Sequence, residues 1–71
     1  MDLDLENLRL RLRLTQAELA EIMLISQRRV SAIENGEEIQ LSTLRKYVEA
    51  LGANLEVNAI MRGERIAILL D

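Results

Sequence analysis

The sequence lacks cysteine, histidine and proline, and it contains one aromatic residue and three glycines. Without cysteine the chain can form no disulfide, and without cysteine and histidine a zinc or haem site is disfavoured. These two residue types are also the most common catalytic nucleophile and general base, and three glycines give little scope for a phosphate-cradling loop. We therefore expect a protein that is not an enzyme and that needs no cofactor or metal.

The sequence also lacks the segments that direct a chain into or across a membrane. No uninterrupted apolar run approaches the roughly 18 residues of a membrane-spanning helix. Residues 1–6 are acidic and lack the positively charged start of a signal peptide. These absences predict a cytoplasmic protein without a membrane partner.

The length and the net charge of the chain restrict its domain organisation and its possible partners. Its 71 residues predict one domain covering 1–71, and a domain of this size hides only about 60% of the surface of its unfolded chain. Tight helical packing or oligomerisation must then supply the stability that disulfides and metals do not. Nine basic against twelve acidic residues give a net charge of −3, which argues against nucleic-acid binding unless the local potential differs.

Four segments have the periodicity or the end signals of helices. The first alternates like a strand around residues 9–14, but its Leu, Arg and Glu content without β-branched residues favours a helix. A capping box from Thr15 to Glu18 starts the second helix, and Ser26 and Ser42 are expected to cap the third and fourth. The predicted helices cover about residues 3–13, 16–23, 27–34 and 42–51.

After Gly52 the apolar period changes from 3.6 to 2, which predicts a β-hairpin over about residues 54–70. The tight turn centres on Arg62-Gly63 or on Gly63-Glu64, and the sequence leaves both open. In either case one apolar row, ending at Met61 in the first strand, faces another in the return strand. The apolar face comprises Leu55, Val57, Ala59, Ile66, Ile68 and Leu70.

The second and third predicted helices have about eight residues each and are joined by a three-residue turn, which is the helix-turn-helix pattern. Residues 14–21, LTQAELAE, and residues 25–36, ISQRRVSAIENG, resemble the Xre/Cro/C1 family of phage repressors and bacterial regulators. Residues 8–52 are similar to the helical domain of that family. Residues 41–52, followed by a hairpin, resemble more narrowly its single-domain antitoxin-like members.

This resemblance implies a mainly α, lambda-repressor-like fold of four helices with a C-terminal β-hairpin. It implies a sequence-specific transcriptional regulator, an antitoxin-like autorepressor that binds a palindromic operator in duplex DNA as a homodimer. A cognate toxin is a further implied partner, and a DNA-bound regulator would be associated with the nucleoid. The alternative is a protein–protein interaction module with the same fold but little DNA affinity.

The resemblance also assigns roles to individual residues. Gln16 and Gln27 match positions that touch DNA, and amide groups can bond phosphate oxygens or adenine edges. Arg9 and Glu34 match a structural ion pair, and Asn35 matches a position whose backbone amide approaches a phosphate. The alternatives are that Arg9 and Glu34 are two unrelated surface charges and that Asn35 only caps the third helix.

The spacing of the third helix orients its remaining side chains. Val30 and Ile33 must face inward, which turns Gln27, Arg28, Ser31 and Ala32 outward. We expect Arg28 to read a guanine and Arg29 to contact a phosphate, whereas Ser31 and Ala32 have short reach. The single aromatic residue, Tyr47, is expected on the inward side of the last helix.

Four residues depart from the family pattern. Leu24 and Arg13 stand where glycine is usual, and a leucine at positive φ costs about 1 kcal/mol or more. Glu37 and Glu38 place negative charge where a loop should approach the phosphate backbone. Leu24 and the acidic charge favour the interaction-module alternative.

The hairpin is the expected dimer interface. A two-stranded hairpin is marginal in water, so pairing with a second copy would bury its apolar face and complete its strand edges. Folding back onto its own helices, or capture by a toxin, are the two alternatives.

Overall fold

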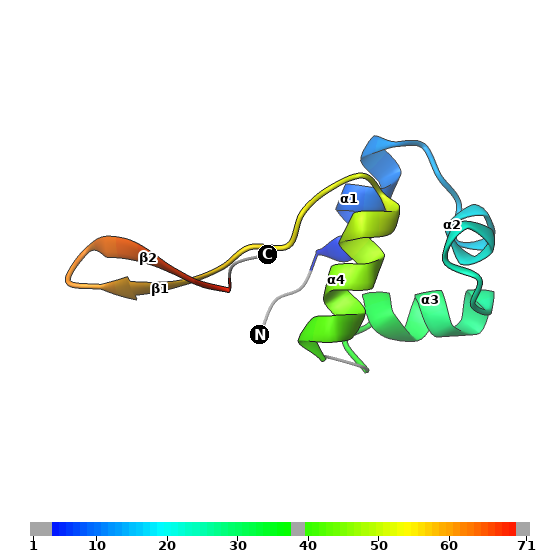
Figure 1. The fold of residues 1–71 in the computed structure, drawn as a ribbon. Helices are drawn as coiled ribbons and strands as arrows, with labels where there is room; N and C mark the ends of the chain where they lie inside the picture. The colour runs from blue at the N-terminus through cyan, green and yellow to red at the C-terminus, as the bar shows by residue number, and fades with distance from the viewer. Residues whose placement is uncertain (1–3, 38–39, 70–71) are drawn as a thin grey trace.

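The structure is a computed structural model that describes residues 4–37 and 40–69. Four helices pack together, and a two-stranded antiparallel hairpin extends away from them (Figure 1). The elements are α1 (Leu5–Arg11), α2 (Gln16–Met23), α3 (Gln27–Glu34), α4 (Leu41–Ala50), β1 (Val57–Met61) and β2 (Glu64–Leu69). The predicted fold class, four helices followed by a β-hairpin, is confirmed. None of the helices in the described ranges has the length and apolar character needed to cross a bilayer.

Two of the three expected helix caps are confirmed. The Thr15 hydroxyl accepts the Glu18 backbone N–H at 3.0 Å and the Glu18 carboxylate accepts the Thr15 N–H at 2.9 Å, which completes the capping box of α2. The Ser26 hydroxyl accepts the Arg29 N–H at 3.1 Å and caps α3. The cap expected at Ser42 is wrong, because the extended residue at this end is Gln40 and α4 already begins at Leu41.

The helix ends depend on residues in the left-handed conformation. α1 ends at Arg11, two residues before the predicted end, because Arg13 has a φ of 58° and cannot continue the helix. The turn between α2 and α3 likewise has Leu24 at a φ of 58°, and this leucine is 90% exposed. Glycine fills the equivalent place after α3 and α4, with φ values of 75° for Gly36 and 79° for Gly52.

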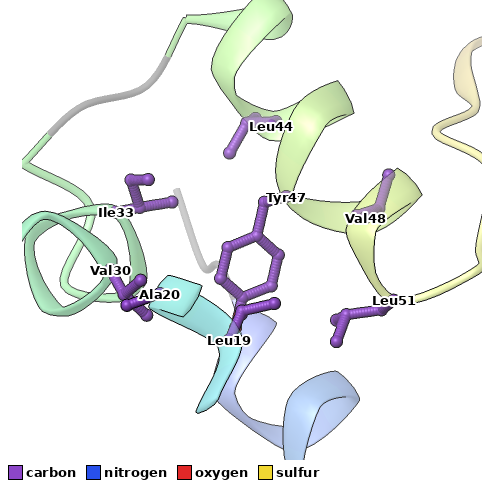
Figure 2. Packing of buried hydrophobic residues seen from close by; sticks show 8 residues of the cluster. All are labelled: Leu19, Ala20, Val30, Ile33, Leu44, Tyr47, Val48 and Leu51. Atoms are coloured by element: carbon purple, nitrogen blue, oxygen red, sulfur yellow. The ribbon is translucent and has the colours of Figure 1, made fainter. Parts of the chain in front are cut away.

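The hydrophobic core lies among α2, α3 and α4. Tyr47 of α4 lies at its centre, with Leu19 of α2 beside the ring (Figure 2). Both side chains are fully buried, as are Val30 and Ile33 on the inner face of α3, so the inward face predicted for the third helix is confirmed. The buried cluster consists of Leu19, Ala20, Val30, Ile33, Leu44, Tyr47, Val48 and Leu51.

The hairpin turn centres on Arg62-Gly63, which decides between the two sequence alternatives. Both residues have positive φ, 53° and 80°, as a type I′ turn requires. Met61 then pairs with Glu64 and Ala59 with Ile66. The register shifts between Val57 and Asn58, so that Val57 pairs with Leu69.

This bulge corrects the predicted hairpin face. Strict alternation would place Ile68 opposite Val57, but the shift makes Ile68 the extra residue of β2. Leu55 precedes β1 and packs, partly buried, against the helical core of its own chain. Leu70 and Glu38, along with the predicted helix start at Leu3, lie outside the described residues.

Candidate nucleic-acid interface

The first turn of α3 presents an exposed polar surface. Gln27, Arg28 and Arg29 are all exposed there, and the helix is anchored by Val30 and Ile33, which have no exposed surface. Ser31 and Ala32 follow on the same helix and are half-buried. The arrangement presents one amide and two guanidinium groups that can donate to base edges or phosphates.

Asn35 lies at the C-terminal end of α3, and its backbone amide is already engaged. That N–H donates to the Ser31 carbonyl at 2.9 Å, which closes the last turn of the helix. The exposed side-chain amide of Asn35 lies 3.4 Å from the Ser31 hydroxyl. Because the backbone N–H is satisfied, the side-chain amide is the donor that this residue offers to solvent or to a ligand.

The predicted ion pair between Arg9 and Glu34 is present. Nε of Arg9 donates to Oε2 of Glu34 at 2.7 Å, and Nη2 donates to Oε1 at 3.2 Å. The two side chains are only 6% and 5% exposed. Arg9 also donates from Nη1 to the Leu14 carbonyl at 2.6 Å, so its guanidinium joins α1 to the loop before α2 as well as to α3.

Two further side chains bind the same carboxylate. The Tyr47 hydroxyl donates to Oε2 of Glu34 at 2.6 Å, and Nε2 of Gln16 donates to Oε1 at 3.1 Å. Sequence reasoning placed Gln16 on DNA and Tyr47 in the core, and it missed that both reach Glu34. A signal was available for Tyr47, because a buried tyrosine hydroxyl usually requires a hydrogen-bond partner.

These contacts shift the pKa values of Glu34, Arg9 and Tyr47. Burial acts to raise the pKa of Glu34, but the hydrogen bonds from Arg9, Tyr47 and Gln16 outweigh it and leave the pKa below its ordinary value. The hydrogen bond to Glu34 raises the pKa of Arg9. Burial, followed by the hydrogen bond to Glu34, raises the pKa of the Tyr47 hydroxyl, which stays protonated at neutral pH.

The pairing of Arg9 with Glu34 determines the local charge on the exposed face of α3. Glu34 is the only acidic residue of α3, and its charge is withdrawn from the surface and compensated by Arg9. The exposed part of the helix therefore carries the two positive charges of Arg28 and Arg29. The overall charge of −3 does not describe this face, although Glu37 lies exposed just beyond its C-terminal end.

The comparison with known families agrees with this geometry. The family described as helix-turn-helix matches residues 5–58, more than half of the chain. The chain belongs to the helix-turn-helix family, so the resemblance found in the sequence is confirmed. This family is defined by a DNA-binding fold and not by a reaction.

The chain is similar to particular members of that family. It is 42% identical over 66 residues to the putative antitoxin HigA2 of Mycobacterium tuberculosis (strain ATCC 25618 / H37Rv), covering 90% of this chain and 65% of HigA2. It is 46% identical over 46 residues to the putative antitoxin HigA3 of the same organism, covering 62% of this chain and 42% of HigA3. The chain thus spans less than two thirds of the length of either relative.

Two solved structures have the same fold. One, of a HigA antitoxin described as inducing DNA bending by unique dimerization, matches with a TM-score of 0.79 and 33% identity, covering 99% of this chain and 96% of that one. The other, of DNA-bound antitoxin HigA3, matches with a TM-score of 0.78 and 33% identity, covering 99% and 94%.

Proposed function

We propose that this chain is a sequence-specific DNA-binding regulator, an antitoxin-like autorepressor that binds a palindromic operator as a homodimer. The observation that carries the proposal is the exposed Gln27-Arg28-Arg29 turn on a recognition helix whose inner face is fully buried. The similarity to a DNA-bound HigA3 and to putative HigA antitoxins supports it.

The interface divides into base-reading and phosphate-binding groups. Gln27 and Arg28 project from the start of α3 and read base edges in the major groove, where arginine pairs with the O6 and N7 acceptors of guanine. Gln16, Arg29 and the side chain of Asn35 bind phosphates. Ser31 and Ala32 have the shortest reach, and Ala32 can contact a thymine methyl group.

The homodimer forms through the hairpin. Met61 and Ile66 lie on the apolar row that includes Ala59 and are 58% and 36% exposed within one chain, and the neighbouring Ile68 is 63% exposed. A second hairpin would bury them and would complete the open strand edges. Two recognition helices about one DNA turn apart, roughly 34 Å, would then match a palindromic site.

A cognate toxin is the second protein partner of the proposed antitoxin. This part of the proposal rests on the similarity to putative HigA antitoxins, because no described residue identifies a toxin surface. A regulator that binds an operator acts in the cytoplasm, at the nucleoid.

The test of DNA binding is selection from a random-sequence duplex library followed by comparison of two charge-matched variants. Arg28→Ala should lower the affinity for the selected duplex by about 1 to 3 kcal/mol and relax the preference at one position of each half-site. Arg65→Ala removes the same charge from the exposed surface of β2 and should do neither. If Arg28→Ala lowers the affinity for all duplex sequences equally, Arg28 contacts a phosphate and does not read a base.

The test of the dimer is analytical ultracentrifugation of hairpin variants. Ile66→Lys places a charge on the apolar row that includes Ala59, whereas Ile60→Lys places the same charge on the neighbouring pair with Arg65. We expect Ile66→Lys to abolish the dimer and Ile60→Lys to weaken it less. A wild-type chain that stays monomeric at high micromolar concentration would refute hairpin dimerisation.

The alternative function is a protein–protein interaction module. The net charge of −3 and the exposed apolar Leu24 favour it. Failure of the wild-type chain to enrich any duplex at low salt would select this alternative.

A further inference from the structure

We infer that Tyr47 is a positioning residue for the DNA contact of Gln16, acting through the carboxylate of Glu34. The inference rests on the proposed DNA-binding function and deepens it. It makes a buried core residue of α4 a determinant of how the surface of α2 meets a phosphate.

Three helices each bring one donor to the carboxylate that the remaining helix, α3, carries. Glu34 at the end of α3 accepts from Arg9 of α1 and Gln16 of α2 at Oε1, at 3.2 and 3.1 Å. At Oε2 it accepts from Arg9 and from Tyr47 of α4, at 2.7 and 2.6 Å. Every hydrogen bond that orients the carboxylate thus comes from another helix.

The carboxylate determines the orientation of the Gln16 amide. An ionised carboxylate only accepts hydrogen bonds, so Gln16 must present Nε2 to it and turn Oε1 away. Nε2 carries a second N–H, which remains for another acceptor. The flipped amide would place Oε1 against the carboxylate oxygen, an acceptor against an acceptor, and would lose this hydrogen bond. The contact with Glu34 therefore selects one amide orientation and fixes the direction in which the second N–H can donate to DNA.

Tyr47 in turn restrains the carboxylate at Oε2. Its ring has no exposed surface, and its hydroxyl lies 2.6 Å from Oε2 of Glu34 and 3.2 Å from the Leu5 carbonyl. Arg9 binds both oxygens, but its contact with Oε1 is long at 3.2 Å, so the hydroxyl adds a second short hydrogen bond at Oε2 that helps to hold the carboxylate in place. The tyrosine hydroxyl holds Oε2, and Oε1 then stays directed at Gln16.

A double-mutant cycle on DNA binding tests this coupling. The variants are Tyr47→Phe, which removes only the hydroxyl, Gln16→Ala, and the double variant, each measured by fluorescence anisotropy on the duplex selected by the wild-type chain. We expect Gln16→Ala to weaken binding about tenfold and Tyr47→Phe about threefold, as for one lost and one misplaced hydrogen bond. The double variant should bind no more weakly than Gln16→Ala alone.

Val48→Ala is the matched control. Val48 is 5% exposed and follows Tyr47 on α4, so its truncation destabilises the core without touching the carboxylate. It should lower the unfolding temperature and leave the affinity of the folded protein unchanged. All variants are compared at a temperature at which circular dichroism shows each of them to be folded.

The NMR signals of the Gln16 side-chain amide give a readout that does not require DNA. Tyr47→Phe should shift the two Nε2 proton resonances, and Val48→Ala should leave them in place. Additive losses of affinity in the cycle, or unshifted amide resonances in Tyr47→Phe, would overturn the inference. If the wild-type chain selects no duplex, the proposed function fails, and the amide resonances still decide whether Tyr47 positions Gln16.

Discussion

The helical body, which comprises α1 to α4, and the hairpin of β1 and β2 differ in how far they bury their apolar side chains. The helices bury Leu19, Val30, Ile33 and Tyr47 completely within one chain. The hairpin leaves Ile60 and Ile68 more than half exposed, although its strands pair in an antiparallel ladder closed by a type I′ turn. The four helices, with Leu55 packed against them, therefore bury their core within one chain, whereas the hairpin leaves large apolar side chains exposed.

The polar contacts differ between the two regions in the same way. Side chains from all four helices converge on Glu34, and the described hairpin has no side-chain hydrogen bond or ion pair of comparable reach. Long-range side-chain contacts join the helices, and only the ladder and the type I′ turn join β1 and β2. The two regions are expected to respond differently to the same kind of perturbation.

The largest expected effect is the loss of the buried carboxylate. Glu34→Ala leaves Arg9 buried without its buried counter-charge and leaves the Tyr47 hydroxyl only the Leu5 carbonyl at 3.2 Å, so the free energy of unfolding should fall by about 3 to 5 kcal/mol in urea titrations. Glu6→Ala is the control, because Glu6 lies 3.8 Å from Arg9 but is 63% exposed. A loss of less than about 1 kcal/mol for Glu34→Ala would contradict the central role of this group.

The next effect is acid sensitivity confined to the helical body. The folded-state pKa of Glu34 is below its ordinary value, so its contribution to stability is present above the unfolded pKa of about 4.3. It is lost as the pH falls through the folded-state value. Thermal melts from pH 6 downward should show this loss, and Glu34→Gln should melt at a lower temperature with a flatter pH dependence. A wild-type melting temperature that does not change in this window would contradict the prediction.

A smaller gain is expected from Leu24→Gly. Leu24 has a φ of 58° and is 90% exposed, so glycine relieves strain and removes almost no buried surface. We expect the free energy of unfolding to rise by about 0.5 to 1 kcal/mol. Leu12→Gly is the control at a 51% exposed leucine with a φ of −96°, where glycine should destabilise. The same sign for both substitutions would show that strain at Leu24 is not the cause.

The smallest effect on the helical body should follow removal of the hairpin. A chain ending at Glu56 keeps Leu55 and Ala53, which pack on the core, and removes both strands. Its free energy of unfolding should stay within about 0.5 kcal/mol of that of monomeric full-length protein, as for changes outside the core. Cooperative loss of helical circular dichroism on truncation would contradict the division into two regions.

The sequence predicted the features that depend on local chemistry. The capping box at Thr15 and the cap at Ser26 are short-range hydrogen bonds, and both are present. The cap predicted at Ser42 lies at Gln40, two residues earlier, because serine is accepted in the first helical turn as well as at the cap. The ion pair of Arg9 and Glu34 was found through resemblance and not through spacing.

The remaining features depend on how distant elements meet. Gln16 and Tyr47 are 31 positions apart and reach one carboxylate only after α2 and α4 pack, which periodicity does not encode. The bulge opposite Val57 interrupts an alternation that continues in the sequence. Both were missed because the pattern specifies which face is apolar and not what that face contacts.

The left-handed residues Arg13 and Leu24 also affect how long the chain would survive a protease. Glycine at these two places would be less strained, and together they cost about 1 to 2 kcal/mol, which multiplies the unfolded population about 5- to 30-fold. A protease that cleaves only opened chains degrades a protein in proportion to that population when refolding is fast. Two side chains that contact nothing in the core thereby shorten the lifetime of the whole molecule.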